Sequence, residues 1–459
     1  MIDPAAQREK FIKMTTRPVE ALVCELAVPS IMSMLISAAY NMADTFFVAR
    51  LDRQSPAAVG VVFSYMALIQ AIAFFFGQGS ANYISRALGA RDSESAASVA
   101  ATGFFSALIV GVGIAASGLL LMDPLLRLLG STDTILPYAR AYMRYILFGT
   151  PFIMCSFVMN NQMRLQGNAW IGTIGITTGA VLNIALDPLL IFGLRMGVGG
   201  AALATMSSQC VAFVILLRLT RMKDGIPIQL RNFRPTLGHY REIAAGGLPS
   251  LGRQGLASFS FAYMNQLAGV YGDVAIAALS VVNRLVMFAT SMVLGFGQGF
   301  QPVCGFNFGA REHARVRRAF WFGVTVTTCW CATLSALGYA FAPRVIALFR
   351  PGDDELIQLG ARALRWECLV YGSIGFTTMA NMYLQNTRRT FSASILAASR
   401  QGLILVPALS LGRRLLGLSG ILSAQPVADA LTFCLSLPLA LGALRSMGRD
   451  GPSGDREGP

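Results

Sequence analysis

Long stretches of apolar residues without an ionisable side chain recur along the chain. Each of the longest exceeds the roughly 20 residues with which a helix crosses a bilayer. Shorter apolar runs that end in Arg complete further spans, so we predict about twelve membrane-spanning helices, the first centred near residue 35 and the last near residue 430. A transmembrane β-barrel is excluded, because its strands alternate apolar and polar residues over segments of about ten. The uninterrupted runs are residues 54–85, 95–122, 165–186, 196–217, 285–310 and 319–343.

The composition leads to the same class of protein. The chain is 54% hydrophobic and 13% charged, against roughly 25% charged residues in ordinary globular chains. This balance excludes a soluble multidomain enzyme and a disordered chain. The polar start at residues 1–20 lacks the small-residue cleavage pattern of a signal peptide. We therefore expect an all-α integral membrane protein whose first apolar segment is retained.

Basic residues are spread unevenly over the two sides that these helices define. If the N-terminus is cytoplasmic, that side collects the larger share of the 37 Lys and Arg, including the basic stretch 218–241. Positive loops stay in the cytoplasm, so we expect a multi-pass protein of the plasma membrane with both termini cytoplasmic. Anionic lipid beside these loops accounts for the net charge of +14. Since no soluble domain remains, no nucleic-acid partner is expected.

The chain contains an internal repeat at an offset of 220 residues. The sequence Phe-Gly-Gln-Gly at 76–79 recurs at 296–299, and Gly-Ala-Arg at 89–91 recurs at 309–311. Six helices per repeat give both halves the same orientation in the membrane. The halves are then related by a pseudo-two-fold axis along the membrane normal.

The repeat divides the chain into two lobes. We expect one six-helix bundle in residues 1–217 and a second in residues 242–459, which ends in a short polar tail. The basic stretch 218–241, which contains Pro and Gly, is the expected cytoplasmic linker. A cleft between two such lobes, open first to one face and then to the other, suits alternating access.

Ionisable residues at membrane depth are candidate functional positions, because each costs on the order of 2.5 to 3.5 kcal/mol by insertion scales. Asp44 follows Tyr40 by four residues, so the two share a helix face. Asp187 follows Asn183 at the same spacing. Each pair could present a carboxylate beside a neutral polar group to one buried cation or proton. The alternative is that both carboxylates only hydrogen-bond neighbouring helices.

These polar groups belong to the first half of the chain alone. A residue needed for packing in both halves would be expected to recur at the offset of the repeat. A polar cluster confined to one lobe therefore indicates a coupling-ion site. The residues 220 positions after Asp44, Asn183 and Asp187 are Met264, Leu403 and Pro407.

Several segments together carry a resemblance to a known family. In their order and spacing they make the chain similar, over residues 18–445, to the multidrug and toxic compound extrusion (MATE) transporters. The segments include VPSIMSMLISAAYNMADTFFVAR at 28–50, NIALDPLLIFG at 183–193, GQGFQPVCGFNFGAR at 297–311 and SRQGLILVP at 399–407.

The resemblance implies a V-shaped pair of six-helix bundles. It also implies an antiporter that exports organic, often cationic or amphipathic compounds in exchange for H⁺ or Na⁺, which is multidrug efflux and a route to antibiotic resistance. Na⁺ would lie at Asp44, Asn183 and Asp187, and no other metal or cofactor is implied. The residues that match the first-lobe cation or proton site of the family are Asp44, Asp187, Asn183, Thr205, Tyr40 and Asn160.

Pro29 lies in the first spanning segment and removes one backbone donor there. By resemblance it matches a kink proposed to straighten or bend with ion occupancy. A static proline kink is the alternative.

The second half departs from one branch of the family, which places acidic cation ligands in helices seven and ten. Here helix seven has no Asp or Glu between Glu242 and Asp273, and Glu367 is expected near the start of helix ten rather than at depth. This puts a second-lobe Na⁺ site in doubt.

Three arginines, Arg253, Arg284 and Arg400, fall inside apolar segments of the second half. A buried guanidinium stays charged and needs a partner. Asp429 in the last helix is the expected partner of Arg400. We predict a structural ion pair between them, with a substrate contact as the alternative.

Other functions share parts of this pattern. A flippase or exporter of a lipid-linked or metabolite substrate in the same superfamily has the same duplicated architecture, but a pyrophosphate substrate needs more cationic residues at depth than these three. An enzyme would need a catalytic motif such as HExxH or a nucleophile elbow, and the sequence has none, so we do not expect an enzyme. A channel does not need two repeats that move against each other. The pattern favours efflux of small organic compounds by a lipid-embedded monomer.

Overall fold

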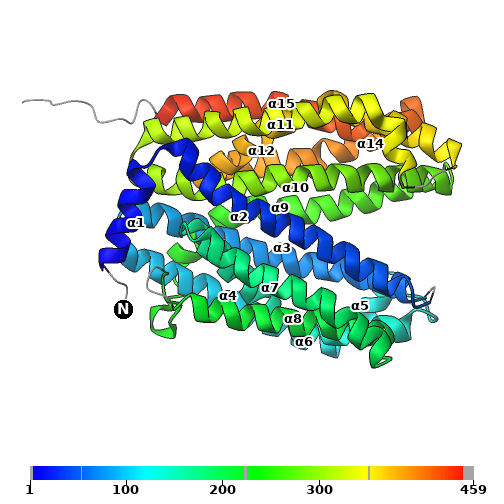
Figure 1. Ribbon diagram of the computed structural model, residues 1–459, viewed down its shortest axis with the longest axis horizontal. Coiled ribbons are helices and arrows are strands. Elements are labelled where there is room, and N and C mark those ends of the chain that lie inside the picture. Colours follow the sequence, from blue (N-terminus) through cyan, green and yellow to red (C-terminus); the bar gives the residue numbers. More distant parts are fainter. Residues whose placement is uncertain (1–3, 53, 222–224, 350–351, 448–459) are drawn as a thin grey trace, which may run out of the picture.

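The computed structural model describes residues 4–52, 54–221, 225–349 and 352–447, and most of them are helical. Figure 1 shows the helices in two groups, one above the other. Ten helical segments of the described chain are long and apolar enough to cross a membrane. Helices α9 and α12, of 33 residues each, are also long enough to cross a membrane. With them the spans number twelve, as predicted. The predicted polar tail (448–459) and part of the linker (222–224) lie outside the described residues.

The first group of helices, here the first lobe, contains the spans that come first in the sequence. Its fifth span, α7, continues into a π-helical turn, η1 (Leu189–Gly193), and a short helix, α5 (Met122–Leu128), joins the third span to the fourth. The spans are α2 (Val19–Val48), α3 (Gln54–Gly89), α4 (Ser93–Leu120), α6 (Leu136–Leu165), α7 (Ala169–Pro188) and α8 (Gly197–Leu219).

The second group, here the second lobe, follows a linker that holds one 3₁₀ turn, η2 (Leu230–Asn232). Its fifth span is interrupted by a π-helical turn, which separates α13 from α14. The elements are α9 (Leu237–Gly269), α10 (Asp273–Gly309), α11 (His313–Ala347), α12 (Asp354–Asn386), α13 (Thr390–Ala398), η3 (Ser399–Leu403), α14 (Leu405–Leu416) and α15 (Leu418–Met447).

Local sequence determines where several of these helices begin and end. The Asp92 carboxylate accepts a hydrogen bond from the Ser95 backbone N–H at 3.0 Å and so caps the start of α4. The turns that end α3 and α10 each contain an arginine in the left-handed conformation, Arg91 with φ 61° and Arg311 with φ 62°. Left-handed residues commonly terminate helices. These two arginines are equivalent in the repeat, so both halves end the second span in the same way.

Two glycines at equivalent positions of the repeat form symmetric contacts between the lobes. A Cβ atom on Gly89 would overlap the carbonyl oxygen of Phe306, and a Cβ atom on Gly309 would overlap the carbonyl oxygen of Arg86. Arg86 and Phe306 are themselves 220 residues apart. The ends of α3 and α10 therefore pack backbone against backbone around a local pseudo-two-fold axis, and only glycine fits at either position.

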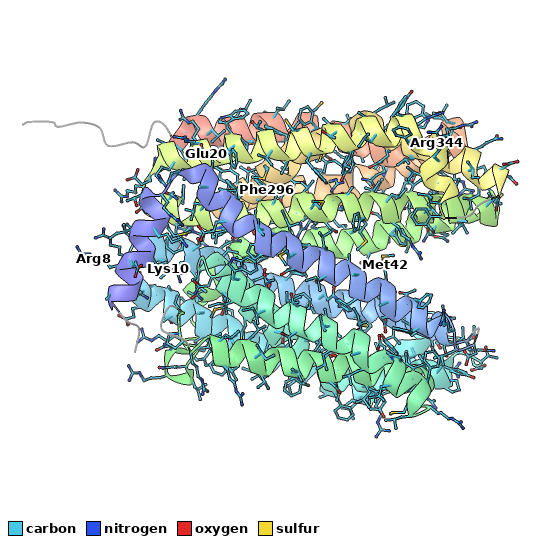
Figure 2. All side chains as sticks on the ribbon, viewed as in Figure 1. Arg8, Lys10, Glu20, Met42, Phe296 and Arg344 are labelled. Carbon is cyan, nitrogen blue, oxygen red and sulfur yellow. The ribbon has the colours of Figure 1, made fainter. Side chains whose placement is uncertain are left out.

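The close contacts between the lobes gather at one end of the described molecule. Gly79 in α3 packs on the backbone of Ile243 in α9, and Gly299 in α10 packs on that of Ala27 in α2. One hydrophobic cluster spans both lobes there, whereas the other large clusters lie almost entirely within one lobe. The two groups of helices diverge toward the opposite end (Figure 1). Met42, on the part of α2 beyond this contact, is 68% exposed (Figure 2).

Helix α1 (Pro4–Thr16) lies across the end where the lobes meet, and the sequence analysis did not predict it. Met14 is buried, and its carbonyl oxygen accepts a hydrogen bond from Asn307 Nδ2 of the second lobe at 3.1 Å. On the side of the first lobe, the Arg91 guanidinium lies 4.3 Å from the centre of the Phe11 ring. The helix therefore bridges both lobes.

Candidate functional site

A pocket inside the first lobe brings together four of the six predicted coupling residues. Tyr40 from α2, Asn160 from α6, Asn183 from α7 and Thr205 from α8 all line it. Four helices that are distant in sequence thus converge on one small space. The two predicted carboxylates are not in the lining and are placed below.

A polar network connects the walls of this pocket. Asn183 donates a hydrogen bond from Nδ2 to Thr205 Oγ1 at 3.4 Å, which joins α7 to α8. The Asn183 Oδ1 atom is buried and has no hydrogen-bond partner among the described residues. The same holds for the hydroxyl oxygens of Ser156 and Ser208, which also line the pocket. Oxygen atoms that share one buried space without partners are a natural environment for a cation or a proton donor.

Asp187 lies one helical turn beyond Asn183 on α7 and is 0% exposed. Neither of its carboxylate oxygens has a hydrogen-bond partner within the described part of the chain. The π-helical turn η1 begins two residues later, after Pro188. Wide turns of this kind occur mostly within longer helices and frequently at functional sites. A buried carboxylate without a partner is costly, and a proton or a cation bound there would lower that cost.

Asp44 lies one turn beyond Tyr40 on α2, so both carboxylates are displaced from the pocket toward the end where the lobes diverge. Asp44 is half-buried, and its Oδ1 atom has no partner in the residues described. The charge of Asp44 interacts with that of Asp187 and with the Tyr40 hydroxyl. The two carboxylates therefore lie close enough for their charges to interact, and we refer to them as one electrostatic unit.

Tyr142 of α6 belongs to this unit, although the sequence analysis did not single it out. It is almost fully buried, and its hydroxyl interacts with the charges of both Asp44 and Asp187. Its neighbours in sequence, Arg140 and Arg144, made this stretch look like a helix end. The sequence feature that could have identified Tyr142 is the i, i+4 spacing in α6, which puts Tyr142 on the same helix face as the buried Ile146.

Pro29 lies inside α2, which runs unbroken from Val19 to Val48. Its carbonyl oxygen accepts a hydrogen bond from the Thr173 hydroxyl of α7 at 2.9 Å, and Ser33 donates to the same hydroxyl at 3.0 Å. Pro29 thus connects α2 with the helix that carries Asp187. On another side, Ala27 and Ile31 of the same stretch contact the second lobe. A change in α2 at Pro29 would therefore act on both the pocket and the contact between the lobes.

The second lobe holds a separate buried charge cluster. Arg400, in the π-helical turn η3, donates from Nε to Asp429 Oδ1 at 2.8 Å, so the structure brings the two residues of the predicted ion pair together. Gln425 donates to the same oxygen at 3.1 Å. Arg253 lies close enough for its charge to interact with that of Arg400.

The expected position of Glu367 near the start of helix ten is wrong. Glu367 lies at mid-length of α12 and is buried, with its charge interacting with those of Arg400 and Asp429. The first turns of α12, from Asp354 to Arg365, are rich in charged residues and resemble a loop in sequence, although they are helical. The second lobe therefore also contains a buried carboxylate at depth.

Comparison with known proteins places these features in a family. A family model described as MatE matches residues 29–189 and 249–409. The second match begins 220 residues after the first, which is the offset of the internal repeat. The multidrug export protein MepA of Staphylococcus haemolyticus is 27% identical over 420 residues, covering 90% of this chain and 91% of that protein.

Solved structures show the same arrangement of helices. A crystal structure of MATE in complex with MaL6 superimposes with a TM-score of 0.90 at 26% identity and covers 95% of this chain and 99% of that one. A crystal structure of MATE in the bent conformation gives a TM-score of 0.89 at 26% identity, with 98% and 99% covered. The division into two six-helix bundles is therefore that of a known transporter fold.

Proposed function

Because the chain belongs to the MatE family of membrane transporters, we propose that it exports organic, cationic or amphipathic compounds in exchange for H⁺ or Na⁺ by alternating access. The multidrug export proteins among its relatives support the substrate class. A family of transporters also agrees with the expectation that the chain is not an enzyme. One chain supplies both lobes and the whole first-lobe site, so the proposed unit is a monomer.

The buried carboxylate of Asp187 is the observation that carries the coupling proposal. It lies beside Asp44, one turn beyond a pocket with unpartnered oxygens, and has no partner of its own in the described residues. A proton or Na⁺ that enters there removes the cost of the buried charge. The inward movement of the coupling ion supplies enough free energy for export. One charge that moves down 100 mV yields about 2.3 kcal/mol, and each unit of pH difference adds about 1.4 kcal/mol per proton.

The position of the contacts between the lobes supports an outward-open state. With the N-terminus in the cytoplasm, the touching parts of α2, α3, α9 and α10 lie on the cytoplasmic side. The opposite ends diverge (Figure 1). Inward opening then requires the glycine contacts to separate. Pro29 lies where a change in α2 would reach both the ion site and these contacts, which makes it the proposed link between them.

Transport by the purified protein in liposomes tests this function. A fluorescent lipophilic cation should leave protein-containing vesicles faster when the outside is made more acidic than the inside, so that H⁺ flows inward, or when Na⁺ is added outside. One of the two gradients should drive export and identify the coupling ion. Export under neither gradient would contradict the proposal and favour the lipid-linked or metabolite substrates of the same superfamily.

Replacing Thr205 by Val keeps the shape of the side chain and removes the hydroxyl that accepts from Asn183. A neutral hydrogen bond contributes about 0.5 to 1.5 kcal/mol, so we expect ion-driven export to slow by up to about tenfold. Thr205→Ser retains the hydroxyl and should stay within about twofold of the wild type. Equal export rates for the Val and Ser variants would show that the Thr205 hydroxyl takes no part in coupling. The rates are measured in the liposome assay.

A further inference from the structure

A second pocket opens where the two lobes meet, at the end covered by α1. Its lining comes from the end of α3 and the turn after it in the first lobe. The second lobe contributes the start of α9, the end of α10, the turn between α12 and α13, and the end of α15. The pocket therefore exists only while the lobes are together at this end. It is separate from the first-lobe pocket, which is lined by residues of α2, α6, α7 and α8.

The lining of this pocket carries an excess of positive charge. Four arginines, Arg86, Arg311, Arg388 and Arg389, share it with two carboxylates. Glu242 is bound by two of them, since Arg86 Nη2 lies 3.2 Å from Glu242 Oε2 and Arg388 donates to Oε1. The other carboxylate, that of Asp92, caps α4. These four arginines and two carboxylates give the lining a net charge of +2.

Arg311 supplies the part of this charge that is free to bind a ligand. Its guanidinium is exposed and makes no hydrogen bond or ion pair with any described residue, whereas the equivalent arginine of the first half, Arg91, stacks on Phe11. Arg389 is also exposed, and its one side-chain contact among the described residues is a hydrogen bond to the Ser446 hydroxyl. Two guanidinium groups thus face one pocket without a carboxylate of their own.

We propose that this pocket binds a phosphate group. Guanidinium groups bind phosphate oxygens with paired, charge-assisted hydrogen bonds. The group could be the head group of an anionic phospholipid of the adjacent leaflet or a soluble phosphate, because both present the same oxygens. The pocket lies at the cytoplasmic end in the proposed orientation, where anionic lipid attracts basic residues.

The bound phosphate stabilises the outward-open state. A ligand that contacts both lobes binds the closed cytoplasmic end and loses its site when the lobes separate, so it shifts the equilibrium toward closure. This regulation goes beyond the proposed transport activity, since neither the exported compound nor the coupling ion takes part in it. It therefore has a conformational readout that does not depend on transport.

The test measures how often the closed end opens. Asn82 in α3 is 0% exposed and donates to the Gly246 carbonyl of the second lobe at 3.5 Å. An Asn82→Cys variant without the native cysteines should react with a water-soluble maleimide only when the lobes separate there. The labelling rate is compared in phosphatidylcholine vesicles, in the same vesicles with inorganic phosphate, and in vesicles that contain phosphatidylglycerol.

We expect phosphatidylglycerol or inorganic phosphate to slow the labelling about fivefold, which corresponds to ~1 kcal/mol. If phosphatidylglycerol slows the labelling, the ligand is a lipid head group; if inorganic phosphate slows it, the ligand is a soluble phosphate. In this background Arg311→Gln with Arg389→Gln should abolish the effect, while Arg414→Gln, an exposed arginine at the end of α14, should retain it. Both pocket arginines are exposed, so these variants should fold. No slowing in the parent, or equal slowing in the double variant, would overturn the proposal.

Discussion

Replacing Asp187 by Asn is expected to reduce ion-driven export to the rate of the passive leak. The substitution keeps the size of the side chain and removes the carboxylate that is fully buried beside Asp44. An amide cannot take up a proton or neutralise Na⁺. A hydrogen bond to a charged group is worth up to about 3 kcal/mol, so the loss should be about a hundredfold or more. The rate is followed in liposomes under the gradient that drives the wild type.

Folding and substrate binding should survive this change. A buried carboxylate without a hydrogen-bond partner does not stabilise the lobe, so the melting temperature of Asp187→Asn should equal or exceed that of the wild type. Asp133→Asn is a matched control, because Asp133 is an exposed carboxylate in an ion pair with Arg127; it should export normally. If Asp44→Asn and Asp187→Asn both retained normal coupled export, the first-lobe assignment would be wrong.

The second large effect is expected at the glycine contacts between the lobes. In Gly309→Ala the new methyl group meets the carbonyl oxygen of Arg86, which is backbone and cannot rotate away. Overpacking costs about 1 to 3 kcal/mol, so the closed end should be destabilised about five- to 150-fold relative to the open one. Maleimide labelling of the Asn82→Cys variant should therefore become faster, and export should slow.

Gly89→Ala provides an independent check, because it introduces the equivalent overlap with Phe306. The two variants should behave alike. Gly113→Ala is the control, since a Cβ atom there meets nothing within 4 Å, and alanine favours the helix. If Gly309→Ala labelled no faster than Gly113→Ala, the lobes would not need this contact to close.

Most of the fold followed from the sequence, because a span without charges and a repeat at a constant offset are both visible in the order of residues. Helix α1 did not. It is only 13 residues long and mostly polar, and it is held by contacts with residues far along the chain, such as Asn307. Tertiary contacts of this kind leave no local pattern.

The candidate site was predictable where a helical spacing links two polar residues, as in Asn183 and Asp187. The structure adds that their helix meets Thr205 of α8 at the pocket. Tyr142 was missed because its partners come from other helices, and no spacing within α6 relates it to Asp44 or Asp187. Which helices are neighbours in space decides such contacts.

The position of α1 also has a consequence for the order in which the protein matures in the cell. The helix is synthesised early, yet its Met14 carbonyl oxygen cannot accept its hydrogen bond until Asn307, 293 residues later, has been synthesised. At the usual rates of translation this is a delay of about 15 to 60 s. During that interval α1 can already contact the first lobe through Phe11 and Arg91, but its contact with the second lobe cannot form. Completion of its docking would mark the moment at which the second lobe has arrived.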